Sequence, residues 1–301
     1  MFSRVLFPTD FSTYANAVLD CLPELKSCGM GEVILLSVIR PQDVPLPESL
    51  NRQALEYWRW SLSEQLNIAT MALEGKGLRV ISRVEYGHPA QWIIQVAEEE
   101  RVSMIVLGAQ GLTIAQEILL GSTAYEVLRR ASVPVLLVKA EIVREIGHIR
   151  CRAICHNLFA HVLHPTDFSP YSQSAFQIVK RLKTAGTKEV TLLHVQDERI
   201  FQKRSAEQVA EFDQHDRERL EELAKVIHLY GMKAETILRH GLPTREVLKV
   251  ADDIGEDCLI VMGIKGTNPL RQILTGSTFE NVVRLCRQSV LAINLAANNP
   301  A

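Results

Sequence analysis

Gly108-Ala109-Gln110-Gly111, followed after nine residues by Gly121-Ser122-Thr123, is the most informative stretch of this sequence. It comes directly after the apolar run 103–107, which is short and uninterrupted, as in a buried parallel strand that leads into a glycine turn. Two glycines three positions apart let the backbone approach a ligand closely. The hydroxyl and N–H groups of Gly121-Ser122-Thr123 come where a helix over 124–131 is expected to begin, and a helix N-terminus favours an anion. The stretch therefore predicts a turn that binds phosphate.

The same pattern occurs a second time in the chain. Gly263-Ile264-Lys265-Gly266 follows the apolar run 258–262, and Gly276-Ser277-Thr278 comes nine residues later. Three further segments recur at separations of 154–157 residues: 4–12 as 161–169, 32–38 as 189–195, and 87–89 as 241–243. This internal repeat predicts two homologous domains, 1–140 and 161–297, joined by a linker over 141–160.

The composition narrows the class of protein. A chain of 301 residues that is 47% hydrophobic and 23% charged is typical of a globular protein with two cores. The net charge of −2 provides no basic field for nucleic acid. There is no run of about eighteen apolar residues and no targeting segment at the N-terminus, so a membrane span is not expected and the predicted location is cytoplasmic. The six cysteines are scattered, and we expect reduced, buried thiols without disulfides.

Strand-like and helical patterns alternate along each half, which predicts an α/β fold: a parallel sheet with helices on both faces. The expected strands of the first half are 4–8, 33–38, 79–85, 103–107 and 135–139. Ser12 and Ser169 are expected to cap the first helix of each half. The other expected helices are 50–74, 89–100 and 124–131 in the first half, and 206–229 and 243–254 in the second. Trp58 and Trp60 on the second helix are expected in the core or at an interface.

The linker is apolar throughout and not rich in glycine or serine, so we expect it to pack against the domains. If it were helical, His148, Cys151 and Cys155 would share one face, with His156 nearby, and could bind a soft metal. The spacing is not that of a zinc finger, and packing is the preferred interpretation. No metal site is therefore predicted.

Several of these segments resemble the universal stress protein family: Pro-Thr-Asp-Phe-Ser after the first strand, Gly-x-Pro before the third helix, and the glycine pattern after the fourth strand. The resemblance covers almost the whole chain as two such domains. It implies two Rossmann-like domains of the adenine nucleotide alpha hydrolase type, each a five-stranded sheet of order 3-2-1-4-5. It also implies ATP at the carboxyl ends of the strands, in agreement with the switch-point rule. The fifth strands, 135–138 and 290–293, are implied to pair the domains within one chain, and a homodimer is left open.

Each half contains residues that are expected to bind the nucleotide. Asp10 and Asp167 end the first strands, and the resemblance implies that their carboxylates hydrogen-bond the ribose or the adenine edge. The alternative is a polar turn residue beside the helix cap. The full set, in which the two valines contribute backbone atoms, is Pro8, Thr9, Asp10, Val38, Gly108, Gly111, Gly121, Ser122, Thr123, Pro165, Thr166, Asp167, Val195, Gly263, Gly266, Gly276, Ser277 and Thr278.

The two halves differ at several positions. Phe7 corresponds to His164, and Pro134 to Ser289. The second half also has Lys265 and Arg271 where the first has Gln110 and Gln116, so it offers more positive charge to phosphates and equal affinity is not expected. No P-loop, dinucleotide-binding Gly-x-Gly-x2-Gly or duplicated catalytic set is present, and no catalytic residue is predicted.

The sequence favours a binding module that responds to adenine nucleotide, most simply ATP, and transmits its presence to a client protein that the sequence does not identify. Two alternatives stay open. One is a slow ATPase or nucleotide transferase that uses Asp10 or Asp167 with Mg²⁺. The other is an interaction scaffold with vestigial sites.

Overall fold

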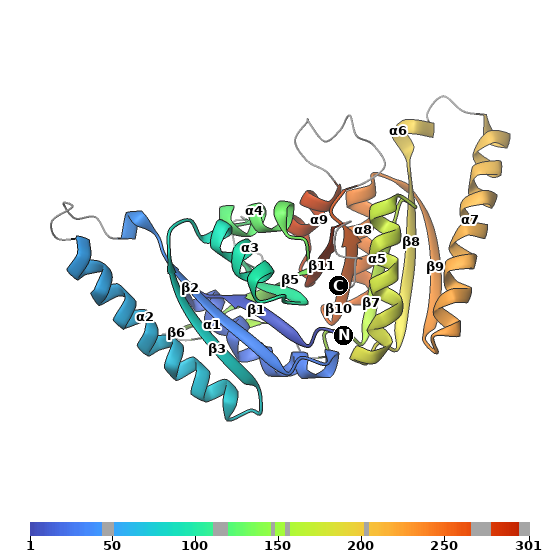
Figure 1. Ribbon diagram of the computed structural model, residues 1–301. Helices are drawn as coiled ribbons and strands as arrows, with labels where there is room; N and C mark the ends of the chain where they lie inside the picture. The colour runs from blue at the N-terminus through green and yellow to red at the C-terminus, as the bar shows by residue number, and fades with distance from the viewer. Residues whose placement is uncertain are drawn as a thin grey trace. The chain divides into compact units, whose positions relative to one another are not determined.

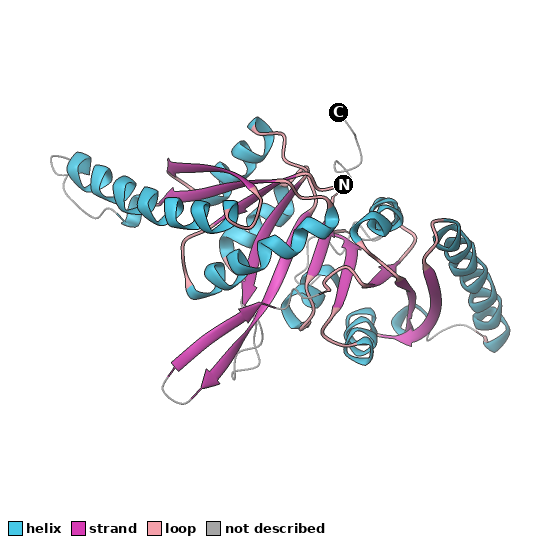
Figure 2. Cartoon of the chain, turned by 90° about the horizontal axis from the view of Figure 1, so that it is seen from below, coloured by secondary structure: helices cyan, strands magenta, loops and turns pink. Residues whose placement is uncertain are grey.

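The computed structural model describes residues 1–43, 51–110, 120–145, 148–153, 157–201, 205–265 and 278–294. The chain divides into two compact units, the first formed by 1–110 and 120–153 and the second mainly by 154–301. Figure 1 labels the elements of both units, and Figure 2, in which strands are magenta and helices cyan, shows helices on both sides of the strands.

The first unit contains a sheet of the predicted order. Its parallel strands are ordered β3-β2-β1-β4-β5, and β6 pairs antiparallel with β5. The strands are β1 (Arg4–Pro8), β2 (Glu32–Ile39), β3 (Arg79–Tyr86), β4 (Met104–Gln110), β5 (Val135–Glu145) and β6 (His148–Ala153). The helices are α1 (Thr13–Cys21), η1 (Leu22–Cys28), η2 (Pro41–Asp43), α2 (Asn51–Glu74), α3 (Pro89–Glu99) and α4 (Ser122–Arg130).

The second unit repeats this arrangement, with its parallel strands in the order β9-β8-β7-β10-β11. The strands are β7 (His161–Thr166), β8 (Glu189–Asp197), β9 (Lys233–Gly241), β10 (Cys258–Gly263) and β11 (Val290–Ile293). The helices are α5 (Pro170–Arg181), η3 (Leu182–Ala185), α6 (Glu198–Phe201), α7 (Ala206–Leu229), α8 (Pro243–Ile254) and α9 (Thr278–Leu285).

The direction of the crossovers places the helices on the two faces of each sheet. Because the connections are right-handed and the strand order reverses at β4 and β10, α1 and α2 share one face and α3 and α4 the other. In the second unit α5 and α7 likewise share a face, opposite α8 and α9. The carboxyl ends of β1 and β4, and of β7 and β10, flank the reversal, where an open α/β sheet offers a crevice.

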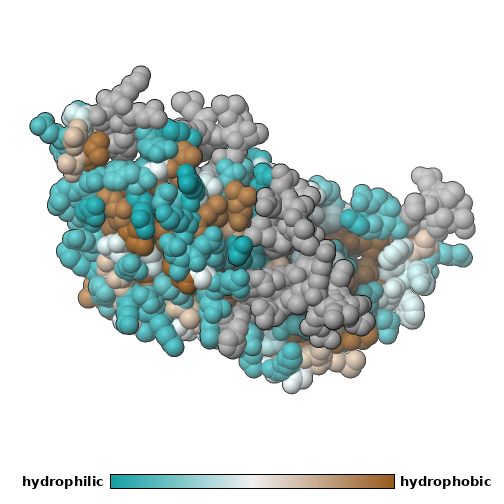
Figure 3. Space-filling model, turned by 180° about the vertical axis from the view of Figure 1, so that it is seen from behind, coloured by the Kyte–Doolittle hydropathy of each residue, from teal (hydrophilic) through white to brown (hydrophobic). Residues whose placement is uncertain are grey.

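Continuous apolar runs form the centre of each sheet. All six residues of β10 are buried, as are residues 104–107 of β4, because both faces of these strands are covered by helices. The predicted caps are confirmed: Ser12 Oγ accepts from Ala15 N at 3.3 Å and Ser169 Oγ from Ser172 N at 3.2 Å. Figure 3 shows hydrophilic residues over much of one face of the molecule, with smaller hydrophobic groups between them.

Three expectations need correction, and one conditional possibility, a helical linker, is excluded for the described residues. The described part of the linker is not helical, since 148–153 is a strand whose apolar residues alternate with polar ones, so the helical metal-binding face does not exist. Cys155 and His156 lie outside the described residues. Cys21 is disulfide-bonded, against the expectation of reduced thiols only, because bonding depends on spatial proximity that scattered sequence positions do not reveal. Trp58 and Trp60 are 38% and 62% exposed, so they are not in the core, and an interface position stays a prediction. The helix expected at Ala124 begins at Ser122.

Within the described part of the chain, no helix is both long and apolar enough to cross a membrane.

Candidate functional site

The first strand of each unit ends in a turn with the same hydrogen bonds. In the first unit, Phe11 N donates to Thr9 Oγ1 at 3.0 Å and Ser12 N donates to Asp10 Oδ1 at 3.0 Å. Phe11 has a φ of +55°, a left-handed conformation that an aromatic residue rarely adopts. The two side-chain acceptors hold the turn in this conformation, so part of the role of Asp10 is structural. Its carboxylate is nevertheless exposed, and a ligand can reach it.

The second unit builds the same turn. Phe168 N donates to Thr166 Oγ1 at 3.0 Å, Ser169 N donates to Asp167 Oδ1 at 3.0 Å, and Phe168 has a φ of +58°. The turn that ends β7 therefore repeats the one that ends β1, although the Asp167 side chain is half-buried. The expected contact of either aspartate with a nucleotide stays a prediction.

The first glycine of each motif has a packing role. A Cβ on Gly263 would lie 2.7 Å from the backbone carbon of Tyr171 and 2.8 Å from its oxygen, so only glycine lets α5 approach β10 this closely. A Cβ on Gly108 would lie 3.3 Å from Val18 Cγ2, a tighter contact than usual with α1. These two glycines are explained by helix packing alone, whether or not a ligand binds.

Gly121 differs from both. It is the N-cap of α4, with a φ of −57°, and no side chain caps the helix. No described heavy atom lies within 4 Å of a Cβ built on it. Neither backbone strain nor crowding among the described residues requires glycine here. The next two residues, Ser122 and Thr123, form the first turn of α4 and are exposed and half-buried.

The remaining predicted residues lie at the same edges or outside the described residues. Val38 and Val195 are half-buried near the ends of β2 and β8, and Pro8 and Pro165 lie at or near the ends of β1 and β7. In the second motif, Thr278 begins α9, and the exposed Lys265 lies with Nζ 5.7 Å from the centroid of the Tyr171 ring. Gly111, Gly266, Gly276 and Ser277 lie outside the described residues, as do Gln116 and Arg271.

A polar cluster at the end of β8 was not predicted as a functional group. In the first unit Ser37 Oγ donates to the Thr9 carbonyl at 2.7 Å. In the second, His194 Nδ1 makes the equivalent bond to the Thr166 carbonyl, also at 2.7 Å. His194 Nε2 also lies 3.3 Å from Asp216 Oδ2 on α7. The replacement of Ser37 by a histidine was the available signal, but its partner on α7 could not be read from the sequence.

Aromatic and cationic side chains extend this cluster. The ring centroids of Phe168 and His194 are 4.7 Å apart, and the Arg219 guanidinium carbon lies 3.7 Å above the Phe168 ring. Asp216 also accepts from Gln196 Nε2 at 2.8 Å. The second unit thus holds its strand-end turn against α7 with interactions that have no counterpart at Phe11 among the described residues of the first unit.

His164, which replaces Phe7, is fully buried two residues before Thr166. Its Nδ1 pairs with the Val261 carbonyl at 2.8 Å, and Nε2 has no hydrogen-bond partner among the described residues. Burial lowers the pKa of this imidazole from 6.5 to about 4, so it is neutral near pH 7. His164 is therefore a core residue in this structure.

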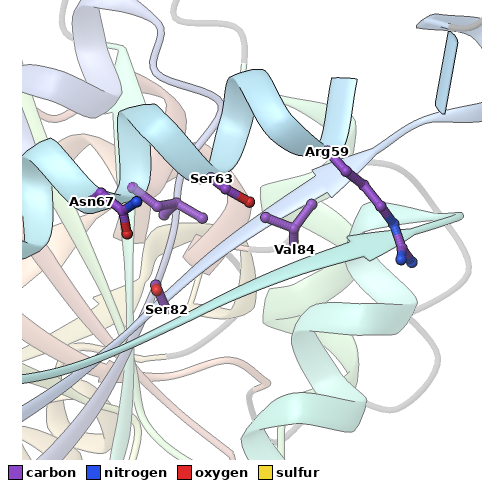
Figure 4. A pocket seen from close by; sticks show the side chains of 6 residues that line it. Arg59, Ser63, Asn67, Ser82 and Val84 are labelled. Atoms are coloured by element: carbon purple, nitrogen blue, oxygen red, sulfur yellow. The ribbon is translucent and has the colours of Figure 1, made fainter. Parts of the chain in front are cut away.

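Among the described residues, two of the cavities border helices that pack on a sheet. One, of about 320 Å³, lies between α2 and β3, and Figure 4 shows the side chains that line it: Arg59, Ser63, Leu66, Asn67, Ser82 and Val84. None of the predicted site residues lines it. The other, of about 350 Å³, lies between α5 and α7 and includes Thr166 in its wall.

These features define a class: a tandem α/β protein with two Rossmann-like sheets, each carrying a strand-end turn at the switch point. Comparison with known proteins identifies the family. The universal stress protein family matches residues 1–139 and 159–294, and the chain belongs to this family, with one domain in each half.

The chain is also similar to individual proteins. A universal stress protein of Methanocaldococcus jannaschii is 34% identical over 155 residues, which is 45% of this chain and 95% of that protein. The solved universal stress protein of Archaeoglobus fulgidus has a TM-score of 0.74 at 23% identity, covering 98% of this chain and 99% of that one, and shows the same fold. A universal stress protein solved in complex with cAMP has a TM-score of 0.34 at 24% identity, covering 46% of this chain and 97% of that one.

Proposed function

We propose that each half of this chain binds an adenine nucleotide, most simply ATP, at the carboxyl edge of its sheet. The chain would then act in the stress response as a regulatory module that changes conformation, or binds a client protein, according to the nucleotide. The observation that carries the proposal is Gly121 at the N-terminus of α4, where no packing among the described residues requires glycine, no described atom fills the space beside it and no described side chain caps the helix. A phosphate group needs both that space and those N–H donors.

The strand-end turns support the same proposal. Asp10 keeps an exposed carboxylate beside the switch point, where it can accept hydrogen bonds from ribose hydroxyls. The chemistry proposed is binding, with or without Mg²⁺. Among the described residues no group of three or more His, Cys, Asp or Glu side chains is placed to hold a metal ion. Any Mg²⁺ would then be held largely by phosphate oxygens and water.

Calorimetric titration of nucleotide-stripped protein tests the proposal. The wild type should bind two ATP molecules, and Gly121→Arg, which fills the space at α4, should bind one. Gly276→Arg should remove the other site. Gly31→Arg is the matched control, because Gly31 also has no heavy atom within 4 Å of a Cβ but precedes β2, at the opposite edge of the sheet. A single site in the wild type, or two sites in both motif variants, would show that the glycines serve only the fold.

A further inference from the structure

We infer that the cavity between α5 and α7 is a binding site for a small organic anion with a flat apolar body, such as an aromatic carboxylate. The cavity has a volume of about 350 Å³, at the lower end of the range for small-molecule sites. It lies between helices on one face of the second sheet, and the inference does not depend on nucleotide binding.

The walls of the cavity provide the apolar part of the site. Phe168 and Phe176 contribute aromatic rings, and Leu223 and Val226 contribute aliphatic side chains from α7. The hydroxyl groups of Thr166 and Ser172 line it too and are bonded to each other at 3.1 Å. An aromatic ring among these side chains would lose water on both faces, which favours binding by the hydrophobic effect.

The charges in the wall favour an anion. Lys180, Arg219 and one carboxylate, Glu222, line the cavity, and Arg219 Nη1 lies 3.8 Å from Asp216 Oδ1, so Lys180 provides the cation that is not at ion-pair distance from a carboxylate among the described residues. Lys180 Nζ lies 5.9 Å from the centroid of the Phe176 ring and 5.7 Å from that of Tyr230. Within the described part of the chain, Lys180 has no carboxylate at ion-pair distance. It is therefore a cation held over aromatic rings and available to a carboxylate ligand.

The length of α5 brings Lys180 to the cavity. Helix α5 has 12 residues, whereas its counterpart α1 has 9 and is followed by Pro23 in the 3-10 helix η1. Counted from the caps Ser12 and Ser169, Pro23 stands at the position of Lys180. The additional turn and its cation thus belong to the second unit only, and the fold shared by both units does not require them.

The test uses the full chain with 3-phenylpropionate as the probe and the uncharged 3-phenylpropionamide as its matched analogue. Titration followed by NMR or calorimetry should show the carboxylate binding about 10-fold or more tightly than the amide, because one hydrogen bond to a charged group contributes about 1.5–3 kcal/mol. The variant K180M keeps the aliphatic stem and should lower carboxylate affinity to that of the amide. The control K225M removes an exposed lysine of α7 that does not line the cavity and should change neither affinity.

A cavity-filling variant adds an independent measurement. V226F places a ring in the cavity and should abolish binding of both probes, with folding checked by circular dichroism. Three results would each overturn the inference. The first is no binding of 3-phenylpropionate at millimolar concentration, and the second is equal affinity for the carboxylate and the amide. The third is the same affinities in K180M and K225M. These measurements are made without nucleotide, so their results do not depend on whether the proposed ATP sites bind ATP.

Discussion

The buried imidazole of His164 should make the stability of the protein depend on pH in a specific way. In the folded chain burial lowers its pKa from 6.5 to about 4, whereas in the unfolded chain it titrates near the unperturbed value. As the pH falls below about 6.5, His164 binds a proton in the unfolded state but stays neutral in the folded state. Stability is therefore lost on acidification, and the loss is complete near pH 4.

The size of this effect follows from the shift. Each pKa unit corresponds to about 1.4 kcal/mol, so between pH 7 and pH 5 His164 should lower the free energy of unfolding by about 2 kcal/mol. Urea unfolding at both pH values measures it. Far-UV circular dichroism is the signal of choice, because all three tryptophans, Trp58, Trp60 and Trp92, lie in the first unit and do not report on the second.

Two substitutions isolate the contribution. His164→Phe introduces the residue found at the equivalent position 7, and His164→Asn keeps a polar side chain that does not titrate. In both variants, the drop in the free energy of unfolding from pH 7 to pH 5 should be about 2 kcal/mol smaller than in the wild type. This holds whatever the stability of the variant at pH 7. An unchanged difference in both variants would show that other groups dominate the acid response and that the buried imidazole is not held neutral.

Three further predictions concern glycine packing, turnover and thiol reactivity. Gly263→Ala should destabilise the fold by about 1–3 kcal/mol, and Gly108→Ala by less. The reason is that a Cβ at position 263 would lie 2.7 Å from backbone, whereas one at position 108 would lie 3.3 Å from a side-chain methyl group. Urea unfolding measures both variants, and the reverse order would contradict the packing argument. ATP turnover should be absent or below about 1 per second, whereas faster hydrolysis that is lost in an Asp10→Ala, Asp167→Ala double variant would indicate an enzyme. Cys258 should resist alkylation at pH 8 in the folded protein, since burial raises its pKa to about 12; labelling at the rate of an unfolded control would refute this.

Patterns along the chain predicted the strands and the helix caps, because these signals are local and each occurs twice. The caps at Ser12 and Ser169 are confirmed, and so is the order β3-β2-β1-β4-β5, which the resemblance to the family implied. The strand β6 was missed although the apolar residues Ile149, Cys151 and Ala153 alternate with polar ones, which is the period of a strand. Because the segment was interpreted only as a linker, its alternation did not lead to the prediction of a strand.

The site was less predictable, because residue type does not reveal what surrounds a residue. Gly108, Gly263 and Gly121 belong to one repeated motif in the sequence, yet a Cβ at Gly263 would clash with α5, whereas one at Gly121 meets no described atom within 4 Å. The sequence left two roles open for Asp10, nucleotide binding and turn formation. Its hydrogen bond from the Ser12 N–H shows the turn role, while the side chain stays exposed. The disulfide at Cys21 likewise depends on three-dimensional proximity.

Around the strand-end turns, the two units differ in the residues packed against the turn and not in the turn itself. Thr-Asp-Phe-Ser has the same hydrogen bonds in both, but the residue that bonds the threonine carbonyl is Ser37 in one unit and His194 in the other. His194 reaches Asp216 on α7, and Arg219, one helical turn further on, stacks on Phe168 in the wall of the α5–α7 cavity. A ligand in that cavity would contact Phe168, next to Asp167, whereas the described residues of the first unit form no such cluster beside Asp10. If both turns bind nucleotide, a ligand in the α5–α7 cavity could therefore alter nucleotide binding at the second turn.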